Sequence, residues 1–139
     1  MAIADGETLT LLVDKTQHRI RIDGIDAPER TQPYSQRARQ SLDDLAKGKQ
    51  ATAQCSKVDK YGRDVCLVII DGTDIGLEQL RRGLAWFFVR YAEELSPDRR
   101  TQYEAAEAEA KAKGRGLWRD ITPVPPWDYR AHRREGVQP

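Results

Sequence analysis

Four segments of the chain show the alternating or short apolar runs that are typical of β-strands. In the second segment Ile20 and Ile22 point to one side, while Arg19, Arg21 and Asp23 point to the other. The isoleucine side suits a protein core, which leaves the charged side to face solvent or a ligand. The pattern predicts strands at Thr8–Val13, His18–Ile25, Gln50–Ser56 and Val65–Ile70.

Three other segments repeat their apolar residues at the three- and four-residue spacing of an α-helix. The predicted helices run from Ser35 to Ala46, from the N-cap Asp74 to Gly83, and from the N-cap Ser96 to Gly114. Pro97 supports the start of the third helix, because proline is favoured at the first helical position. The run Leu84–Val89 predicts one more short strand, and the proline-rich tail from Thr122 is predicted to be irregular.

The mixture of strands and helices places the chain in the α+β class. Its 139 residues suffice for one ordinary core, so we expect one domain over residues 1–121 and a C-terminal tail over residues 122–139. The 23 Lys and Arg nearly balance the 22 Asp and Glu, so that only locally placed charges could attract nucleic acid. No run is apolar and long enough to span a membrane, and we expect a monomer without a membrane partner.

The two cysteines, Cys55 and Cys66, flank a predicted turn at Tyr61–Gly62 almost symmetrically. If the flanking strands pair so that Lys57 faces Asp64, the two cysteines face each other across the hairpin. The pattern then allows either a cross-strand disulfide or two buried thiols in neighbouring strands.

The start of the chain bears on where the protein works. The chain opens four residues before the Asp5–Gly6 turn, and no signal peptide is visible. We expect a mature form from which an export signal was trimmed, and such a form would be secreted or periplasmic. A natural cytoplasmic start is the alternative.

The nine residues from Arg21 to Glu29 combine an arginine with three carboxylates at the end of a predicted strand. Pro28 fixes its own φ angle and keeps Ala27 out of the helical region, so this turn is stiff. Ca²⁺ and Mg²⁺ take carboxylate and carbonyl oxygens, and phosphate takes a guanidinium group. A stiff turn that carries Asp26 and Glu29 beside Arg21 therefore suits a hard metal ion together with an anionic substrate. The simpler alternative is a surface ion pair between the arginine and a neighbouring aspartate.

Short motifs on either side of this turn extend the pattern along the chain. The motifs are Asp5-Gly6-Glu7-Thr8, the turn from Arg21 to Glu29, and Asp59-Lys60-Tyr61-Gly62-Arg63, followed by Leu80–Ala85 and Gly116–Trp118. Each motif alone is weak evidence, but together and in this order they extend over nearly the whole chain. In this pattern the chain resembles the staphylococcal (micrococcal) nuclease family. The resemblance implies a five-stranded OB-type β-barrel with three helices, a fold that commonly binds oligonucleotides.

The resemblance also implies roles for individual residues. Arg21 and Arg63 match the two arginines that bind the scissile phosphate, and Glu29 matches the general base that activates the attacking water. The implied reaction is in-line hydrolysis of phosphodiester bonds in single-stranded DNA or RNA. Tyr91 matches a tyrosine of the family's nucleotide site, and Tyr61 is placed to line the phosphate side.

The family holds a Ca²⁺ ion with two aspartates and one backbone carbonyl. Asp26 matches one carboxylate and Ala27 matches the residue that offers its carbonyl. The second carboxylate position falls on Glu7, where the family usually has aspartate. Because Ca²⁺ tolerates variable geometry, we expect calcium as the cofactor, with Mg²⁺ or Mn²⁺ as alternatives that the longer side chain would favour.

A non-catalytic OB-type module that binds nucleic acid or protein is the competing hypothesis. It is favoured by Glu7, by the near-neutral charge, and by Val89, which stands where the family has a second tyrosine. The arginines and the glutamate base are nevertheless present, which favours the nuclease.

Other polar and aromatic residues are expected to play smaller roles. We expect Asp23 to be solvated or to pair with Arg19, and His18 and His132 to have no functional role. Trp118 and Trp127 are expected to anchor the last helix and the tail.

Overall fold

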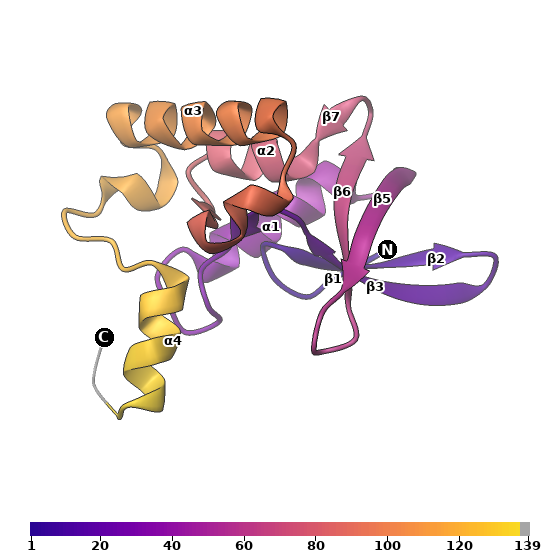
Figure 1. Ribbon diagram of the computed structural model, residues 1–139, viewed down its shortest axis with the longest axis horizontal. Coiled ribbons are helices and arrows are strands. Elements are labelled where there is room, and N and C mark those ends of the chain that lie inside the picture. Colours follow the sequence, from indigo (N-terminus) through magenta and orange to yellow (C-terminus); the bar gives the residue numbers. More distant parts are fainter. Residues whose placement is uncertain (137–139) are drawn as a thin grey trace.

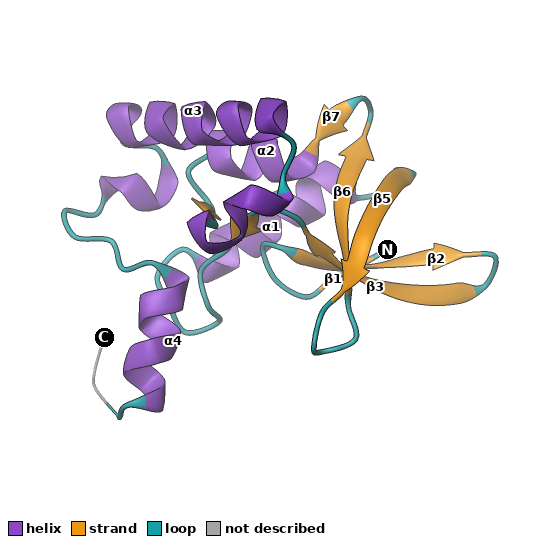
Figure 2. Ribbon diagram, in the orientation of Figure 1, coloured by secondary structure: helices purple, strands orange, loops and turns teal. Residues whose placement is uncertain are grey.

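The computed structural model describes residues 1–136 and has the strands of its main sheet on one side and most of its helices on the other (Figure 1; Figure 2). The strands are β1 (Ala2–Ile3), β2 (Thr8–Val13), β3 (Thr16–Ile22), β4 (Ile25–Asp26), β5 (Ala51–Val58), β6 (Asp64–Ile70), β7 (Thr73–Asp74) and β8 (Trp86–Phe87). The α-helices are α1 (Ser35–Ala46), α2 (Ile75–Arg81), α3 (Pro97–Lys113) and α4 (Pro126–Arg134), and short 3₁₀ segments cover Val89–Glu94 and Gly116–Arg119.

The main sheet pairs its strands in the order β1-β2-β3-β6-β5, with β7 on β6, while β4 and β8 form a separate two-stranded ribbon. This confirms the predicted α+β class. The main sheet has six strands, and the strand predicted at Leu84–Val89 is the short β8, which lies outside this sheet. Pairing of β2 with β3 sets Thr8 opposite Arg21, and the parallel pairing of β3 with β6 sets Arg21 beside Val65. The register therefore brings the first two motifs and the end of the third to one part of the sheet.

The core confirms the alternation seen in β3. Ile20 and Ile22 are buried, and they join side chains from β2, β6 and the helices in one cluster. The predicted strand to Ile25 is interrupted, however, because Gly24 turns the chain at a φ of 81°. A Cβ atom there would lie 2.9 Å from the Tyr103 ring, so only glycine combines this φ angle with the close packing of α3. The interruption sends β4 away from the main sheet toward β8.

The three predicted helices are confirmed, together with their caps. The Asp74 side chain accepts a hydrogen bond from the Leu77 amide, and the Ser96 hydroxyl accepts one from the Arg99 amide. Gly114 ends α3 in the left-handed conformation with a φ of 61°. None of the helices within residues 1–136 combines the length and the apolar character that a membrane crossing needs.

The prediction that the tail is irregular is wrong for residues 126–134, which form α4. Pro126 stands at the start of this helix, where its missing N–H has no intrahelical partner to lose. Asp128 in the first turn and basic residues in the last turn complement the helix dipole. The Trp127 ring stacks on Phe88 with 5.5 Å between centroids, which confirms Trp127 as an anchor. Residues 137–139 of the predicted tail lie outside the described residues.

Asp23 is not solvated and does not pair with Arg19, contrary to prediction. It is buried and accepts a hydrogen bond of 3.2 Å from Arg99 on α3. Arg99 also donates to the Tyr103 hydroxyl, which in turn donates to Asp74 at the start of α2. Burial raises the pKa of Tyr103, and the Asp74 carboxylate raises it further, so the phenol stays neutral and donates. This network ties α3 to the strand that carries Arg21.

Cys55 and Cys66 form a disulfide between β5 and β6. The two residues are partners in the register, but Lys57 lies opposite Val65 rather than Asp64. A bulge between Cys55 and Lys57 causes the difference, because it inserts one residue into β5. The disulfide thus fixes the base of the hairpin whose turn carries Arg63.

Candidate active site

The Asp5-Gly6-Glu7 turn holds the first acidic side chain of the site. The Asp5 carboxylate accepts a hydrogen bond of 2.8 Å from the Glu7 amide. A Cβ atom on Gly6 would lie 2.7 Å from the Ala38 side chain, so glycine alone lets the turn press against α1. From α2, the buried Gln79 side chain donates to the carbonyls of Gly6, at 2.9 Å, and Ala38, at 3.0 Å. The helices therefore fix this turn from behind.

Glu7 points from this turn into the protein and contacts two other motif residues. Its Oε2 atom accepts a hydrogen bond from the Ala27 amide and lies 3.2 Å from Nη2 of Arg21. Burial raises the pKa of Glu7 to about 8, with Arg21 opposing the rise and the Asp26 and Asp5 carboxylates adding to it. At neutral pH the buried Glu7 carboxyl therefore favours its protonated form unless a further cation lies beside it.

The two arginines predicted to bind phosphate lie beside the same threonine. Nη1 of Arg63 donates to the Thr8 hydroxyl at 3.0 Å, and Thr8 is the β2 partner of Arg21. Nε of Arg63 also donates to Asp59 at 2.8 Å, which orients the guanidinium. The Arg21 guanidinium lies over the Phe88 ring, 5.5 Å from its centroid. Residues 42 positions apart are thus brought to one place by the sheet register.

Glu29 lies in the turn that follows β4 and is partly exposed. Its amide donates to the Gln32 side chain at 2.9 Å, and the Gln32 amide donates back to the Glu29 carbonyl at 2.8 Å. Burial raises the pKa of Glu29, while Arg130 lowers it and Asp26 raises it. A carboxylate whose pKa moves toward neutrality is a better general base at neutral pH, because proton transfer to it becomes more favourable.

Arg130, which the sequence analysis did not predict, reaches into the carboxylates from α4. Its Nη2 atom lies 2.8 Å from Oδ2 of the fully buried Asp26, and its Nη1 atom lies 3.2 Å from Oδ1 of the same side chain. Nη1 also lies 3.4 Å from Oε2 of Glu29. A helix start at Pro126 followed by an anchoring Trp127 is the signal in the sequence that could have revealed this helix.

The two candidate tyrosines flank the arginines on the surface. Tyr61 is largely exposed, and the Arg63 guanidinium lies 5.5 Å from its ring centroid. Tyr91 is less exposed and packs edge-to-face on Phe88, with 5.0 Å between centroids. The structure therefore places Tyr61 beside Arg63, and it places Tyr91 against the ring that Arg21 covers. Each ring also lies under a cation, Arg63 over Tyr61 and Lys57 over Tyr91, the latter 4.7 Å from the centroid.

Comparison with known proteins shows the family of the chain. The family model described as "Staphylococcal nuclease homologue" matches residues 19–120. The chain belongs to the staphylococcal nuclease family. The match contains four of the five motifs, all except Asp5–Thr8, and ends before α4, so the helix that supplies Arg130 lies outside it.

Relatives in bacteria and plants share this family. An uncharacterized endonuclease of Escherichia coli O157:H7 is 34% identical over 134 residues, which cover 95% of this chain and 82% of the relative. An uncharacterized endonuclease of Haemophilus influenzae is 32% identical over 133 residues, or 95% of this chain and 71% of the relative. A probable staphylococcal-like nuclease of Oryza sativa subsp. japonica is 33% identical over 87% of this chain. The chain spans about a third of the length of that plant relative, 35%.

The family implies a calcium ion, and the donors present fit one in their chemistry. Asp5, Glu7, Asp26 and Glu29 offer the carboxylate oxygens that hard divalent cations take. Among residues 1–136, only Arg21 and Arg130 form ion pairs with them. The buried negative charge that this leaves is what a divalent cation would neutralise. Within residues 1–136, no group of three or more His, Cys, Asp or Glu side chains is arranged as a metal site. Both Asp26 oxygens are instead held by Arg130.

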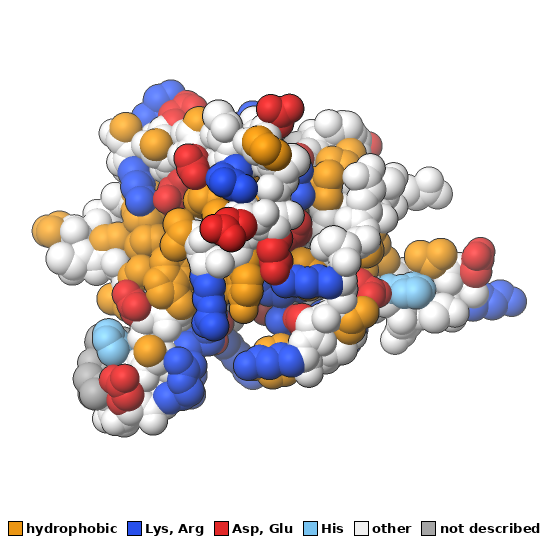
Figure 3. Space-filling model, viewed as in Figure 1, with side chains coloured by type: hydrophobic (Ala, Val, Ile, Leu, Met, Phe, Trp, Pro, Cys, Tyr) orange, Lys and Arg blue, Asp and Glu red, His pale blue; other side chains and the backbone are white. Residues whose placement is uncertain are grey.

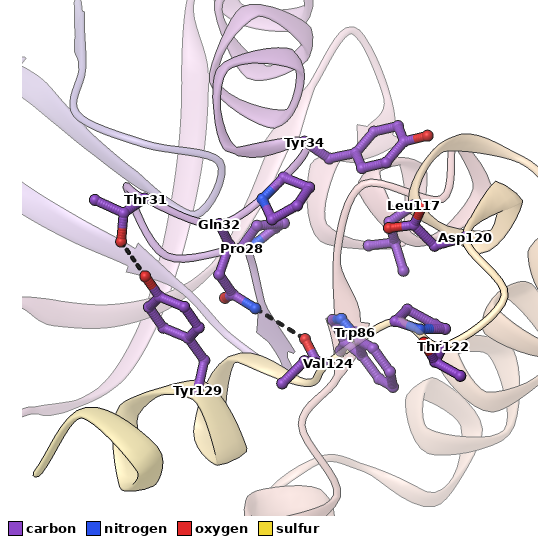
Figure 4. Close-up of a pocket in the computed structure, with 12 residues that line it drawn as sticks. Pro28, Thr31, Gln32, Tyr34, Trp86, Leu117, Asp120, Thr122, Val124 and Tyr129 are labelled. Atoms are coloured by element: carbon purple, nitrogen blue, oxygen red, sulfur yellow. Dashed lines mark hydrogen bonds between the residues drawn. The ribbon is translucent and has the colours of Figure 1, made fainter. Parts of the chain in front are cut away.

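Charged side chains gather in the middle of one face of the molecule. Figure 3 shows basic and acidic side chains together in the middle of the face, between the sheet and the C-terminal helix. Behind the Glu29 turn lies a pocket of about 370 Å³ between this turn and the C-terminal segment (Figure 4). Its lining includes Gln32, Trp86 and Tyr129, and the described arginines and carboxylates of the candidate site do not line it. The pocket therefore lies at the interface between the Glu29 turn and the C-terminal tail.

Proposed function

We propose that this protein is a calcium-dependent nuclease that hydrolyses phosphodiester bonds in single-stranded DNA and RNA with little sequence preference. The proposal rests on one arrangement. Arg21 contacts buried carboxylates, Arg63 lies beside the strand partner of Arg21, and the partly exposed Glu29 is linked to the same carboxylates through Arg130. Family membership and the names of the relatives, which are nucleases and endonucleases, support the same reaction class.

The arginines act on the scissile phosphate. Arg63 is held by Asp59 and Thr8 before substrate arrives, so little of its freedom is left to lose on binding. Guanidinium groups donate paired hydrogen bonds to phosphate oxygens, and these bonds strengthen as negative charge builds up on the oxygens in the transition state. Arg21 and Arg63 therefore bind the phosphate of the substrate, and they bind the transition state more tightly than the substrate.

Glu29 acts on the attacking water. Its carboxylate takes a proton from the water as the water oxygen forms a bond to phosphorus, and the bond from phosphorus to the 5′ oxygen breaks on the opposite side. The departing oxygen takes a proton from solvent, which leaves a 3′-phosphate and a 5′-hydroxyl. The hydrogen bonds between Glu29 and Gln32 hold the backbone of the base in place during this step.

Glu7, Asp26 and the carbonyl of Ala27 are the residues that would hold calcium. When bound, the ion would supply positive charge that polarises a phosphoryl oxygen. Glu7 contributes a longer side chain than the family's usual aspartate, and its carboxylate is already held by the Ala27 amide and Arg21.

The test compares the parent protein with Glu29→Gln and Arg63→Ala on single-stranded DNA and RNA, in calcium and in EDTA. We expect cleavage that requires calcium, and a loss of about 10²–10⁴-fold in kcat/KM in each variant with the fold retained. Glu104→Gln, an exposed change on α3 of the same type, serves as the control and should cleave like the parent. If both site variants cleave at the rate of the parent protein, the proposal is wrong.

The non-catalytic module is the second candidate, and one observation favours it. Arg130 occupies both oxygens of Asp26, the carboxylate that a catalytic cation needs. The same experiment separates the two functions. Salt-dependent binding of single strands by the parent protein, with no cleavage in calcium, magnesium or manganese, would establish the module instead.

We also propose that the protein works in an oxidising compartment, either secreted or in a periplasm. The Cys55–Cys66 disulfide supports this location, because such bonds persist outside the reducing cytosol. Thiol titration of protein isolated from its native source tests it. Two free thiols in that material would place the protein in a reducing compartment.

A further inference from the structure

The C-terminal segment lies along the back of the turn that carries Glu29. The Gln32 side chain donates to the Val124 carbonyl at 2.9 Å, and the Thr31 and Tyr129 hydroxyls are hydrogen-bonded to each other (Figure 4). The Trp127 ring stacks on Phe88 with an interplanar angle of 3°. Two hydrogen bonds to the turn and the ion pairs of Arg130 therefore hold this segment against the turn, and the ring stack on Phe88 anchors it beside the turn.

Arg130 makes the contact that matters most for chemistry. Its guanidinium takes both oxygens of Asp26 and one oxygen of Glu29, and its own side chain is 32% exposed while that of Asp26 is fully buried. Burial lowers the pKa of Arg130, but its hydrogen bond to Asp26 and the negative charges of Asp26 and Glu29 outweigh burial and raise the pKa above its ordinary value. The Arg130 guanidinium thus contacts both Asp26, the carboxylate expected to bind the metal, and Glu29, the carboxylate expected to act as the base.

We propose that Arg130 is a positioning residue of the active site, and that the C-terminal segment is therefore part of the catalytic unit. The inference rests on the proposed nuclease function and adds a residue to its machinery. A planar guanidinium fixes the plane of the carboxylate that it grips with two bonds, which a lysine ammonium does not do. Without it, Asp26 and Glu29 repel each other and the Glu29 side chain loses its one described cationic partner.

The alternative is that Arg130 merely stands where a cation belongs and must leave before the enzyme works. The two ideas predict opposite results when the charge is removed. A positioning residue leaves behind misaligned carboxylates, so catalysis falls and calcium binds no more tightly. A competitor leaves behind two free Asp26 oxygens, so calcium binds more tightly and catalysis is kept or improved.

The test uses the full chain with Arg130→Gln, Arg130→Lys and, as a control, Arg134→Gln, which removes the same charge from an exposed position at the end of α4. Cleavage of single-stranded DNA in calcium gives kcat and KM. We expect kcat to fall about 100-fold in Arg130→Gln, with KM within about threefold, because a shift of about 1 Å in a catalytic group has effects of this size. Arg130→Lys should recover part of this loss, and Arg134→Gln should match the parent.

Two further measurements do not depend on catalysis. Calorimetric titration with calcium should show binding to Arg130→Gln that is no tighter than binding to the parent. Hydrogen exchange of residues 26–33 should speed up in Arg130→Gln but not in Arg134→Gln, because the Glu29 and Gln32 amides lie in the turn that Arg130 holds.

The outcomes separate this inference from the proposed function. Unchanged kcat in Arg130→Gln, or tighter calcium binding with kcat kept or raised, would overturn the positioning role. If the parent cleaves nothing, the nuclease proposal fails, and with it the catalytic role of Arg130. Faster exchange in Arg130→Gln would then show that the arginine clamps the turn for another purpose.

Discussion

At the scale of single residues, Asp59 shows how one carboxylate prepares a catalytic side chain. Its Oδ1 atom accepts hydrogen bonds from the amides of Tyr61 and Arg63, and its Oδ2 atom accepts one from Nε of Arg63. Burial raises the pKa of Asp59, but these hydrogen bonds to Arg63 and Tyr61 together lower it below its ordinary value of 3.8. The turn therefore depends on the charged form of this side chain.

This gives a pH dependence with a definite sign. Because the folded protein holds the Asp59 proton less tightly than the unfolded chain does, the stabilisation is complete above the ordinary pKa and is lost as pH falls through the lowered one. Asp59→Asn should therefore lower the free energy of unfolding by about 1 kcal/mol at pH 7, and by less at pH 3. Urea unfolding at both pH values measures it, with Glu104→Gln as a surface control. An equal loss at both pH values would contradict the assignment.

At the scale of elements, α2 supports the site through one buried amide. Gln79 is fully buried, and its side chain donates to the carbonyls of Gly6 and Ala38 and accepts from the Ser41 hydroxyl. The helix thereby links α1 to the turn that carries Glu7. Side-chain amides with all their hydrogen bonds satisfied specify one arrangement, because any other arrangement leaves buried polar atoms without partners.

Replacing the Gln79 side-chain amide should lower the free energy of unfolding, although the side-chain volume hardly changes. Gln79→Leu keeps the volume but leaves the Gly6 and Ala38 carbonyls and the Ser41 hydroxyl without the partner that α2 supplies. We expect a loss of about 2–4 kcal/mol in the free energy of unfolding, since each buried group left without a partner costs about 1–3 kcal/mol. Chemical denaturation checks this, and Gln102→Leu on the exposed face of α3 should change stability by less than about 0.5 kcal/mol. Equal effects of both changes would show that the hydrogen bonds of Gln79 contribute little.

The elements also show what could be predicted from sequence and what could not. The ends of α2 and α3 follow from caps within a few residues, such as Ser96 and Gly114, so local sequence sufficed. The motif residues Arg21, Arg63 and Glu29 were predicted to share one site, and the register of β2, β3 and β6 brings the two arginines together. Arg130 was missed because its contact with Asp26 spans 104 residues and depends on the docking of α4. Contacts of that kind leave no local pattern.

At the scale of the whole molecule, the disulfide acts on the unfolded chain more than on the site. It closes a loop across 11 residues between two paired strands, so it removes freedom from the unfolded state. Reduction should therefore lower the free energy of unfolding by about 3 kcal/mol in the chain-entropy account. Unfolding with and without a reducing agent measures it, and the Cys55→Ala, Cys66→Ala double variant should not respond to the agent. A parent protein equally stable in both conditions would show that the bond contributes nothing.

The balance of charge over the whole molecule predicts how salt will affect substrate binding. A formal charge of +1 gives no long-range attraction, so binding must depend on the few cations that touch phosphates. About three such contacts, from Arg21, Arg63 and Lys60, which lies over the Tyr61 ring, predict that the logarithm of the binding constant falls with the logarithm of salt concentration with a slope of about −2. Glu29→Gln, which should bind without cleaving, is the protein to titrate by fluorescence anisotropy between about 50 and 200 mM salt. Adding Arg63→Gln should reduce the slope by about 0.7, whereas Lys15→Gln, at the far turn between β2 and β3, should leave it unchanged. A slope near zero would mean that the arginines do not meet phosphate, because a base-stacking surface alone releases no counterions.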